Sequence, residues 1–425
     1  MSRTDIDLCW VNVHGGSFHA LLHLARRLRA EGLSCRVLLS SSPPLGLQAG
    51  LDITAQDQAV LEGEGVRILP VEDMERAIRQ DGARLCVFDA HEGEQVPALI
   101  AAARESGRLT AQLSTLLADF TYHGADYALV QHPISLWFVF DYSRERRAAR
   151  LAQAKGVYFS GNVFYEPLTN TWTSAVRTRE DLAARYGLDP ARPILLWLPN
   201  REDGLEMAYG AVLDRAREAG MGVLVKLHPW EYKQLRHGFD PYGLGKTSAE
   251  HWGATAMDER DASWALAFCD AGIMRGSSLG LELPFWRKPG IYLPRPGVHA
   301  RWHSLLLEMT KGASLHLPGV EALGPCLAAW PPHISDEGYA AAKRYTMPVG
   351  SGGPGQPDSL TLHARHLADI LNGGRAAFSP EGDAGRLRAL YEPEIPRNFY
   401  ARLLPRQRAL FALRRMAGLM PKQTD

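Results

Sequence analysis

The sequence predicts an α/β protein built from two Rossmann-like domains with parallel sheets, followed by a helical tail. Short apolar runs alternate with helical patterns along most of the 425 residues, which is typical of βαβ units and of parallel sheets covered on both faces. A chain of this length exceeds the size at which one hydrophobic core keeps growing, so two domains are expected. The apolar runs also fall into two series, separated by a stretch without clear periodicity that begins at residue 160.

The first series predicts an N-terminal domain over residues 1–180. An apolar run near 6–13, a helix and a second run near 35–40 together make one βαβ unit. The helix carries apolar residues at helical spacing, namely Ala20, Leu21, Leu24 and Leu28. Further strands are predicted near 66–70, 84–89, 109–113, 127–131 and 157–160.

The second series predicts a domain over residues 181–375, with a helical tail over 376–425. Thr178 and Asp181 have the spacing of a capping box at the start of its first helix. Ser359 is predicted to cap the last helix of this domain. Strands are predicted near 194–198, 222–227, 271–275 and 290–293.

Composition excludes several classes of function. Lys plus Arg and Asp plus Glu both number 47, so no global field would draw the chain to nucleic acid. The five cysteines lack Cys-x-x-Cys spacing and are expected to be buried thiols in a reducing compartment. No targeting segment and no apolar stretch of about 18 residues is present, so we expect a cytoplasmic protein. No metal-ligand spacing is found, which predicts metal independence.

The C-terminal segment 397–422 carries seven basic residues and no acidic one, interleaved with leucine and phenylalanine. One interpretation is a terminal helix that packs on the body of the protein and exposes a basic face. The other is a helix that lies on an anionic membrane surface, since basic residues near such a surface each add about 1 kcal/mol of attraction. The second interpretation would place the protein peripherally on the inner face of the membrane.

A Gly-Ser-Ser turn, Gly276 to Ser278, follows the predicted strand 271–275. A helix that begins there would point unpaired backbone N–H groups and a positive dipole toward a phosphate. Glu282 would lie one helical turn further on and could accept hydrogen bonds from ribose hydroxyls. The alternative is that one serine only caps the helix.

A second polar cluster follows the predicted strand 222–227, with Lys226, His228 and Pro229 at its end. Ligands of open α/β sheets bind outside the carboxyl ends of the strands, so this cluster would converge on the Gly-Ser-Ser turn. Arg201 follows the strand 194–198 and could form a forked contact with a phosphate. An ordinary polar loop is the alternative for Arg201.

Two places in the first domain could hold an acceptor. Gly15 and Gly16 allow a sharp turn after the first strand and would leave His14 near the end of that strand. His123, before the strand near 127–131, and His132, just after it, have similar, weaker claims.

Asp89, His91 and Glu92 follow the buried strand 84–89. A carboxylate or imidazole at a strand end is where a general base could take the proton of an acceptor hydroxyl. The alternative is that the carboxylates only match the positive end of the next helix.

These motifs make the chain resemble GT-B glycosyltransferases over roughly residues 6–375. "KLHP" at 226–229 and "GSSLGLE" at 276–282 are similar to the His-Pro and paired-serine motifs of bacterial surface-polysaccharide enzymes. Those enzymes are the CDP-glycerol glycerophosphotransferases, capsule Kdo transferases and bacterial sialyltransferases. "SGNVFYE" at 160–166 resembles the Gly-Asn-Pro stretch that closes their first domain, although Val163 replaces the proline.

The resemblance implies two Rossmann-like domains that face each other across a cleft. It further implies that His228, Ser277 and Ser278 hold the phosphate of the donor and that Glu282 binds its ribose. The donor would be a CMP- or CDP-linked unit in preference to a UDP-linked one. Pro284 departs from the family pattern and predicts a bend just after Glu282.

The expected activity is metal-independent transfer of a glycosyl or alditol-phosphate unit, without a cofactor, to a glycan or lipid-linked glycan of a bacterial surface polysaccharide. One alternative is a non-hydrolysing UDP-sugar epimerase, which would share the fold and the phosphate site. Another is a scaffold without catalytic activity in a membrane-associated polysaccharide assembly.

Overall fold

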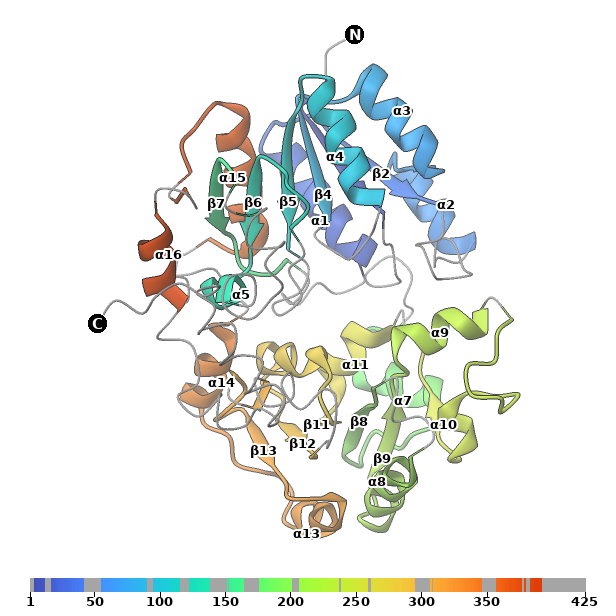
Figure 1. The fold of residues 1–425 in the computed structure, drawn as a ribbon. Coiled ribbons are helices and arrows are strands. Elements are labelled where there is room, and N and C mark those ends of the chain that lie inside the picture. The colour runs from blue at the N-terminus through green and yellow to red at the C-terminus, as the bar shows by residue number, and fades with distance from the viewer. Residues whose placement is uncertain are drawn as a thin grey trace, which may run out of the picture. The chain divides into compact units, whose positions relative to one another are not determined.

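The computed structural model divides into two compact units (Figure 1). Unit 1 comprises residues 1–166 and 344–425, and unit 2 comprises residues 167–343. The structure describes residues 4–11, 17–41, 55–89, 95–114, 122–137, 151, 153–163, 176–200, 206–236, 238–258, 261–294, 306–307, 309–345, 357–376, 378–379 and 383–391.

Unit 1 is built on a sheet of seven parallel strands in the order β3-β2-β1-β4-β5-β6-β7. These strands are β1 (Ile6–Trp10), β2 (Cys35–Ser40), β3 (Arg67–Leu69), β4 (Leu85–Asp89), β5 (Leu109–Leu113), β6 (Tyr127–Val130) and β7 (Gly156–Phe159). Each lies within, or within one residue of, a strand predicted from the sequence. Strands β1 and β4 are buried at every position, which explains why all their residues except Asp7 and Asp89 are apolar.

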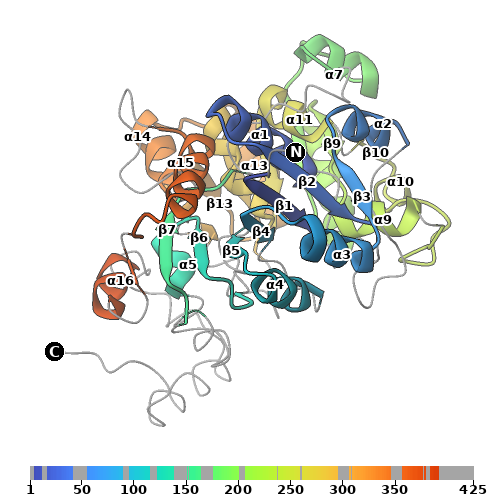
Figure 2. The ribbon, with the colours of Figure 1, turned by 90° about the horizontal axis from the view of Figure 1, so that it is seen from above.

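Helices cover both faces of this sheet. The helices of unit 1 are α1 (Ser17–Ala30), α2 (Ala55–Gly63), α3 (Val71–Asp81), α4 (Gln95–Glu105), α5 (Pro133–Trp137), α15 (Ser359–Leu371) and α16 (Ala384–Tyr391). Figure 2 shows α1 and α15 on one face and α3 and α4 on the other, and the members of each pair contact each other. The doubly wound arrangement agrees with the Rossmann-like architecture that the sequence predicts.

Helix α15 returns to unit 1 from the far end of the chain. It packs on α1, and the hydroxyl of Tyr158 on β7 donates to Asp369 Oδ2 at 2.8 Å. The contacts therefore place α15 in unit 1, whereas the boundary predicted at residue 375 puts it in the second domain. Asp358 caps this helix by accepting from the backbone N–H of Thr361, so the prediction of Ser359 as the cap was wrong by one residue.

Unit 2 is built on a second parallel sheet, with the strand order β10-β9-β8-β11-β12-β13. These strands are β8 (Ile194–Leu198), β9 (Gly222–Val225), β10 (Thr255–Ala256), β11 (Ala271–Met274), β12 (Gly290–Tyr292) and β13 (Ser314–His316). The sequence predicts four of them and misses the edge strands β10 and β13. Both are at most three residues long and partly exposed, so neither carries a distinct apolar run.

The α-helices described in unit 2 begin with α7 (Arg179–Tyr186), whose predicted capping box is present. The Thr178 side chain accepts from the backbone N–H of Asp181, and the Asp181 carboxylate accepts from the backbone N–H of Thr178. The others are α8 (Met207–Glu218), α9 (Pro229–Arg236), α10 (Ser248–His251), α11 (Ala262–Phe268), α13 (Leu323–Ala328) and α14 (Asp336–Lys343).

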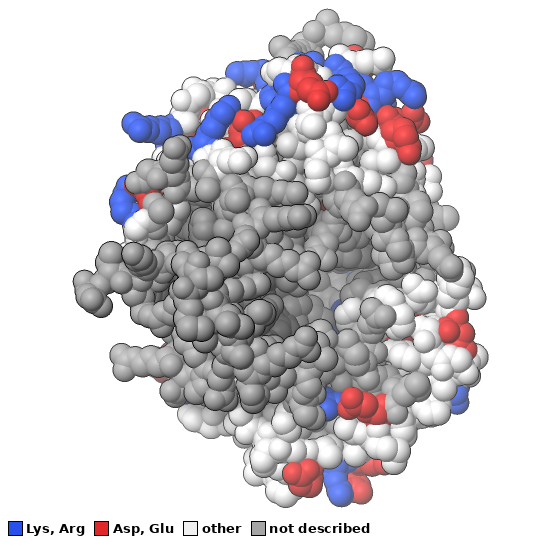
Figure 3. Space-filling view, viewed as in Figure 1, with Lys and Arg blue, Asp and Glu red and all other residues white. Residues whose placement is uncertain are grey.

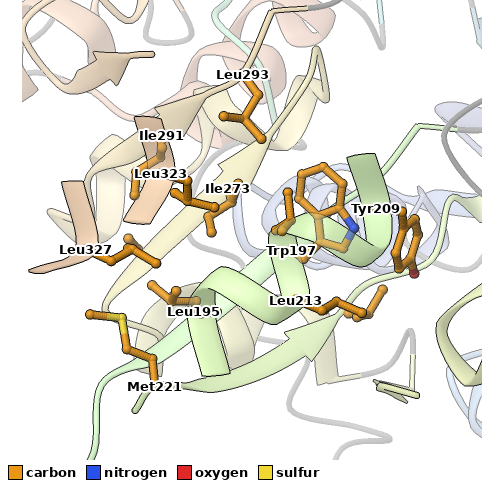
Figure 4. Packing of buried hydrophobic residues seen from close by; sticks show 14 of the residues in the cluster. Leu195, Trp197, Tyr209, Leu213, Met221, Ile273, Ile291, Leu293, Leu323 and Leu327 are labelled. Atoms are coloured by element: carbon orange, nitrogen blue, oxygen red, sulfur yellow. The ribbon is translucent and has the colours of Figure 1, made fainter. Parts of the chain in front are cut away.

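The core of unit 2 lies between the sheet, α8 and α13 (Figure 4). Trp197 of β8 and Tyr209 of α8 pack edge to face, with ring centroids 5.7 Å apart, and both are completely buried. Leu195, Ile273 and Ile291 extend this layer across three strands. Packing of this kind fixes the strands, and with them the positions of the residues that follow each strand.

The described surface carries mixed charge. On the face drawn in Figure 3, basic and acidic side chains are interleaved over the described part of unit 1. One example of such pairing in unit 1 is Arg79, which forms ion pairs with Glu75 and Glu105. Within the described ranges, no helix is long and apolar enough to cross a membrane. The same ranges contain no group of three or more His, Cys, Asp or Glu side chains that could hold a metal ion. All five cysteines are free thiols.

Candidate functional site

The carboxyl ends of β9, β8 and β11 lie at one edge of the unit 2 sheet, with β8 in the middle. All three strands are parallel, so the residues that follow them emerge on the same side. The backbone N–H of Lys226 donates to the carbonyl of Trp197 at 3.0 Å, which continues the pairing of β9 with β8 one residue past the end of β9. The sequence motifs at 226–229 and 276–282 therefore flank the end of β8.

Two ionisable side chains of these motifs, those of Lys226 and Glu282, interact electrostatically. Burial raises the pKa of the Glu282 carboxyl to about 8, and the nearby Lys226 ammonium opposes this by lowering it. Lys226 is itself buried, with 7% of its surface exposed. A buried cation from the end of β9 and a carboxyl group beyond β11 thus lie close together.

The backbone after β11 differs from the expected α-helix. Residues Ser278–Leu281 form a short 3₁₀ helix, η4, and Leu283–Trp286 form a second one, η5. Pro284 lies in the first turn of η5 and has no backbone N–H to continue a helix from η4. The prediction of a helix that begins at the Gly-Ser-Ser turn was therefore wrong in type, and a single 3₁₀ turn supplies little of the dipole that we expected to attract a phosphate.

The Gly-Ser-Ser turn itself is formed by local constraints. Gly276 has a φ of +136°, a conformation that residues with a side chain rarely adopt. Ser277 is the N-cap of η4, and its Oγ accepts from the backbone N–H of Leu279 at 3.4 Å. Both serines remain partly exposed. Ser277 therefore caps the short helix, as the alternative interpretation of this motif predicted. Because its hydrogen bond to the N–H of Leu279 is long, the hydroxyl can also bind a ligand.

His228 caps helix α9. Its ring Nδ1 accepts from the backbone N–H of Trp230 at 3.1 Å, and its carbonyl accepts from the backbone N–H of Glu231 at 2.8 Å. Pro229 occupies the first helical position, where its fixed φ favours the helix. Because Nδ1 acts as an acceptor, the neutral ring carries its hydrogen on Nε2 and is a donor there.

Two buried charged residues near this edge were not predicted from the sequence. Arg275, between β11 and the Gly-Ser-Ser turn, is 7% exposed, pairs with Glu206 at the start of α8, and donates from Nε to the carbonyl of Pro294 at 3.3 Å. Glu231 of α9 is 2% exposed and accepts from both the backbone N–H and the hydroxyl of Ser248. Arg275 could have been identified from the sequence as a candidate, because it is a charged residue that directly follows an apolar strand.

In unit 1, Asp89 and His123 are linked through Gln112. Asp89 ends β4 and is completely buried. The Gln112 side chain donates to the carbonyl of Asp89 at 3.3 Å, and its Oε1 accepts from the backbone N–H of His123 at 2.6 Å. Both hydrogen bonds are to backbone atoms, so Gln112 joins the chain segments that carry these two predicted residues.

Several predicted site residues lie outside the described residues and stay predictions. They are His14, Gly15, Gly16, His91, Glu92, Arg201 and the tail at 397–422. Pro229 is described only as part of the backbone of α9.

Solved structures match nearly the whole chain at low sequence identity. Staphylococcus aureus MnaA in a co-structure with UDP has a TM-score of 0.52 and 10% identity, over 87% of this chain and 96% of that one. The chain has a GT-B-like fold. The Methanocaldococcus jannaschii UDP-GlcNAc 2-epimerase, in complex with UDP-GlcNAc and UDP, shares this GT-B-like fold with a TM-score of 0.52 and 11% identity, over 87% and 100% of the two chains.

A glycotransferase of kitacinnamycin also shares the GT-B-like fold. Its structure matches this chain with a TM-score of 0.51 and 13% identity, over 88% of this chain and 99% of that one. No model of a known protein family matches the sequence, and neither does any curated protein. The matches confirm the predicted fold of two Rossmann-like domains.

Proposed function

We propose that this protein is an enzyme that uses a nucleotide sugar, and that the carboxyl edge of the unit 2 sheet binds the diphosphate of that ligand. One observation carries the proposal: Lys226, after β9, lies close enough to Glu282, beyond β11, to lower the pKa of its carboxyl group. This edge of the sheet then carries a cation, the Nε2–H donor of His228 and the two serine hydroxyls. Such a set of donors suits a phosphate group.

We propose uridine as the base of the nucleotide, in place of the cytidine implied by the sequence resemblance. This choice is supported by two structures that share the GT-B-like fold, one with UDP bound and the other with UDP-GlcNAc and UDP. Glu282 is proposed to bind the ribose. A carboxyl group that keeps its proton near neutral pH can both donate a hydrogen bond to a ribose hydroxyl and accept one from it.

Epimerisation of a UDP-sugar is the reaction that the structural matches favour, since several of the matched structures are UDP-GlcNAc 2-epimerases. Glycosyl transfer is the second candidate, because the kitacinnamycin glycotransferase matches equally well and the His-Pro and paired-serine motifs resemble those of transferases. Both reactions develop negative charge on a departing nucleoside diphosphate. Lys226, His228, Ser277 and Ser278 would stabilise that charge in either case.

Under glycosyl transfer, unit 1 would supply the general base and the acceptor contacts. We propose Asp89, His91 or Glu92 as the base. The proposed acceptor contacts come from His14, Gly15, Gly16 and His123. Association of the segment 397–422 with an anionic membrane would bring a lipid-linked acceptor to the enzyme and belongs to the same proposal.

Nucleotide binding tests the proposal. UDP at one hundred times its Kd should stabilise the protein by about 2.7 kcal/mol, which thermal unfolding detects, and CDP and CMP should stabilise it less. Lys226→Gln should weaken UDP binding, measured by calorimetry on folded protein. Lys311→Gln, which removes an exposed lysine of unit 2, should leave it unchanged. Absence of binding by all three nucleotides would reject the proposal and favour the scaffold alternative.

Incubation with UDP-GlcNAc alone separates the two reactions. An epimerase should convert part of the substrate to the C2 epimer without any acceptor, and the products can be resolved by NMR of the anomeric proton. A transferase should leave the UDP-GlcNAc unchanged until a glycan acceptor is added and should then release UDP. Formation of the epimer would exclude transfer as the main activity.

A further inference from the structure

The same His-Pro cap occurs once in each unit. His132 follows β6 and precedes α5, as His228 follows β9 and precedes α9. The ring Nδ1 of His132 accepts from the backbone N–H of Ile134 at 3.2 Å, and its carbonyl accepts from the backbone N–H of Ser135 at 2.9 Å. These bonds repeat the pattern at His228 residue for residue. Unit 1 therefore has its own histidine at the carboxyl edge of its sheet.

The hydrogen bond at Nδ1 fixes the chemistry of His132. The neutral ring carries its hydrogen on Nε2 and can donate from there. Burial, and secondarily Arg344, lower the pKa of His132 to about 4, so the ring is neutral at physiological pH. His132 is 94% buried, with 6% of its surface exposed. Within the part of the chain that the structure describes, no group accepts from Nε2–H, so this donor is available to a ligand.

A cation lies beside this donor. The ring of His132 packs against that of Tyr345, with centroids 5.5 Å apart and an angle of 58° between the planes. The guanidinium of Arg344 lies over the same tyrosine ring, 4.7 Å from its centroid, and donates to the tyrosine hydroxyl at 2.6 Å. Tyr345 therefore forms a platform that holds a neutral N–H donor and a positive charge next to each other.

A hydrogen-bond donor and an adjacent cation together suit a negatively charged oxygen. We propose that His132, Tyr345 and Arg344 form an anion-binding site in unit 1 for a phosphate or carboxylate group. His132 donates to the anion from Nε2, and Arg344 contributes charge. The site consists of unit 1 residues and shares none with the set proposed to bind the diphosphate in unit 2, so an experiment can reject either proposal without rejecting the other.

The test follows the ring signals of the histidines by NMR in the full chain labelled with ¹⁵N-histidine. His132→Asn and His228→Asn identify the two signals among the 15 histidines. Phosphate, and in a second titration acetate, should move the His132 Nε2 signal and raise the pKa of His132 by about one unit, since a nearby anion favours the imidazolium. Arg344→Gln should weaken this response at least tenfold in apparent affinity. Arg375→Gln, which removes an exposed arginine of unit 1, should not.

The outcomes are distinct. A response to phosphate alone would support the site with phosphate as the ligand, and a response to both anions would add carboxylates. No response at His132 to either anion, or an equal response in Arg344→Gln, would overturn the inference. A response at His228 without one at His132 would leave the proposed function intact and reject this site. If His132→Asn does not fold, His132→Gln provides the assignment.

Discussion

Gly280 packs against the side chains of Tyr292 and Met274, so that no space remains for a Cβ atom. Tyr292 is 1% exposed and cannot move aside easily. The close approach links the Gly-Ser-Ser turn to the buried strand β12. A glycine between the two serines and Glu282 is therefore a requirement of packing at this position.

We predict that Gly280→Ala destabilises the protein by about 1–3 kcal/mol, the usual cost of an extra methyl group in a tightly packed core. Urea unfolding would measure the change. Gly385→Ala is the matched control, because this glycine of α16 has open space around its Cβ position, and it should be neutral or slightly stabilising. Equal effects of the two substitutions would contradict the packing explanation.

Glu282 makes the stability of unit 2 depend on pH. Burial raises the pKa of its carboxyl group from 4.5 to about 8 in the folded protein, although Lys226 lowers it. Between these values the folded state holds a proton that the unfolded state has lost. The stabilisation of the folded state that this bound proton provides is therefore complete below about pH 4.5 and is lost as the pH rises toward 8.

Thermal unfolding between pH 5 and pH 8 checks this prediction. Glu282→Gln should unfold at a temperature that falls less steeply with pH than that of the wild type. Glu218→Gln, on the exposed side of α8 with 61% of its side chain accessible, should follow the wild-type profile. A Glu282→Gln profile parallel to that of the wild type would show that the carboxyl group titrates normally.

At the scale of the elements, the strands could be predicted almost completely from the sequence. Buried parallel strands such as β8, with the sequence ILLWL, consist of apolar residues at every position, and no turn residue interrupts them. β10 and β13 could not be predicted, because two or three partly exposed residues at a sheet edge leave no periodic pattern. Their pairing depends on neighbours that are distant in the sequence.

The candidate site could be predicted only in part. The positions of Lys226 and the Gly-Ser-Ser turn follow from strand ends, which are visible in the sequence. The 3₁₀ geometry after β11 could not be predicted from helical spacing, and the pairing of Arg275 with Glu206 joins residues 69 positions apart. Contacts of that kind arise from tertiary packing.

The capping box of α7 gives a prediction at this scale. Thr178→Ala removes the side-chain oxygen that accepts from the Asp181 N–H and should reduce the free energy of unfolding by about 1 kcal/mol. Thr178→Ser keeps the hydroxyl and should retain most of the stability. Urea unfolding of both variants measures the difference, and equal losses would show that the methyl group of the threonine matters more than the cap.

At the scale of the whole molecule, the two units differ in how the chain builds them. Unit 2 is one continuous segment, whereas unit 1 needs two segments with unit 2 between them. Helix α15, in the second segment, buries His363, Ala364, Leu367 and Ile370 when it packs in unit 1. Unit 1 is incomplete without this cover.

We predict that residues 167–343, expressed alone, unfold in one cooperative transition. Residues 1–166 alone should bind a hydrophobic dye strongly, because the surface that α15 covers would be exposed. Co-expression with residues 344–425 should reduce dye binding. Cooperative unfolding of 1–166 without dye binding would show that α15 is dispensable.

The return of α15 also sets the order of events during synthesis on the ribosome. Roughly 200 residues lie between β7 and α15, and translation at about 5–20 residues per second takes about 10–40 s to add them. During this interval the nascent sheet of unit 1 lacks α15, whereas unit 2, which is synthesised later, can already fold. The part of the protein that leaves the ribosome first is thus the last to be finished, and it is the part for which a chaperone would matter most.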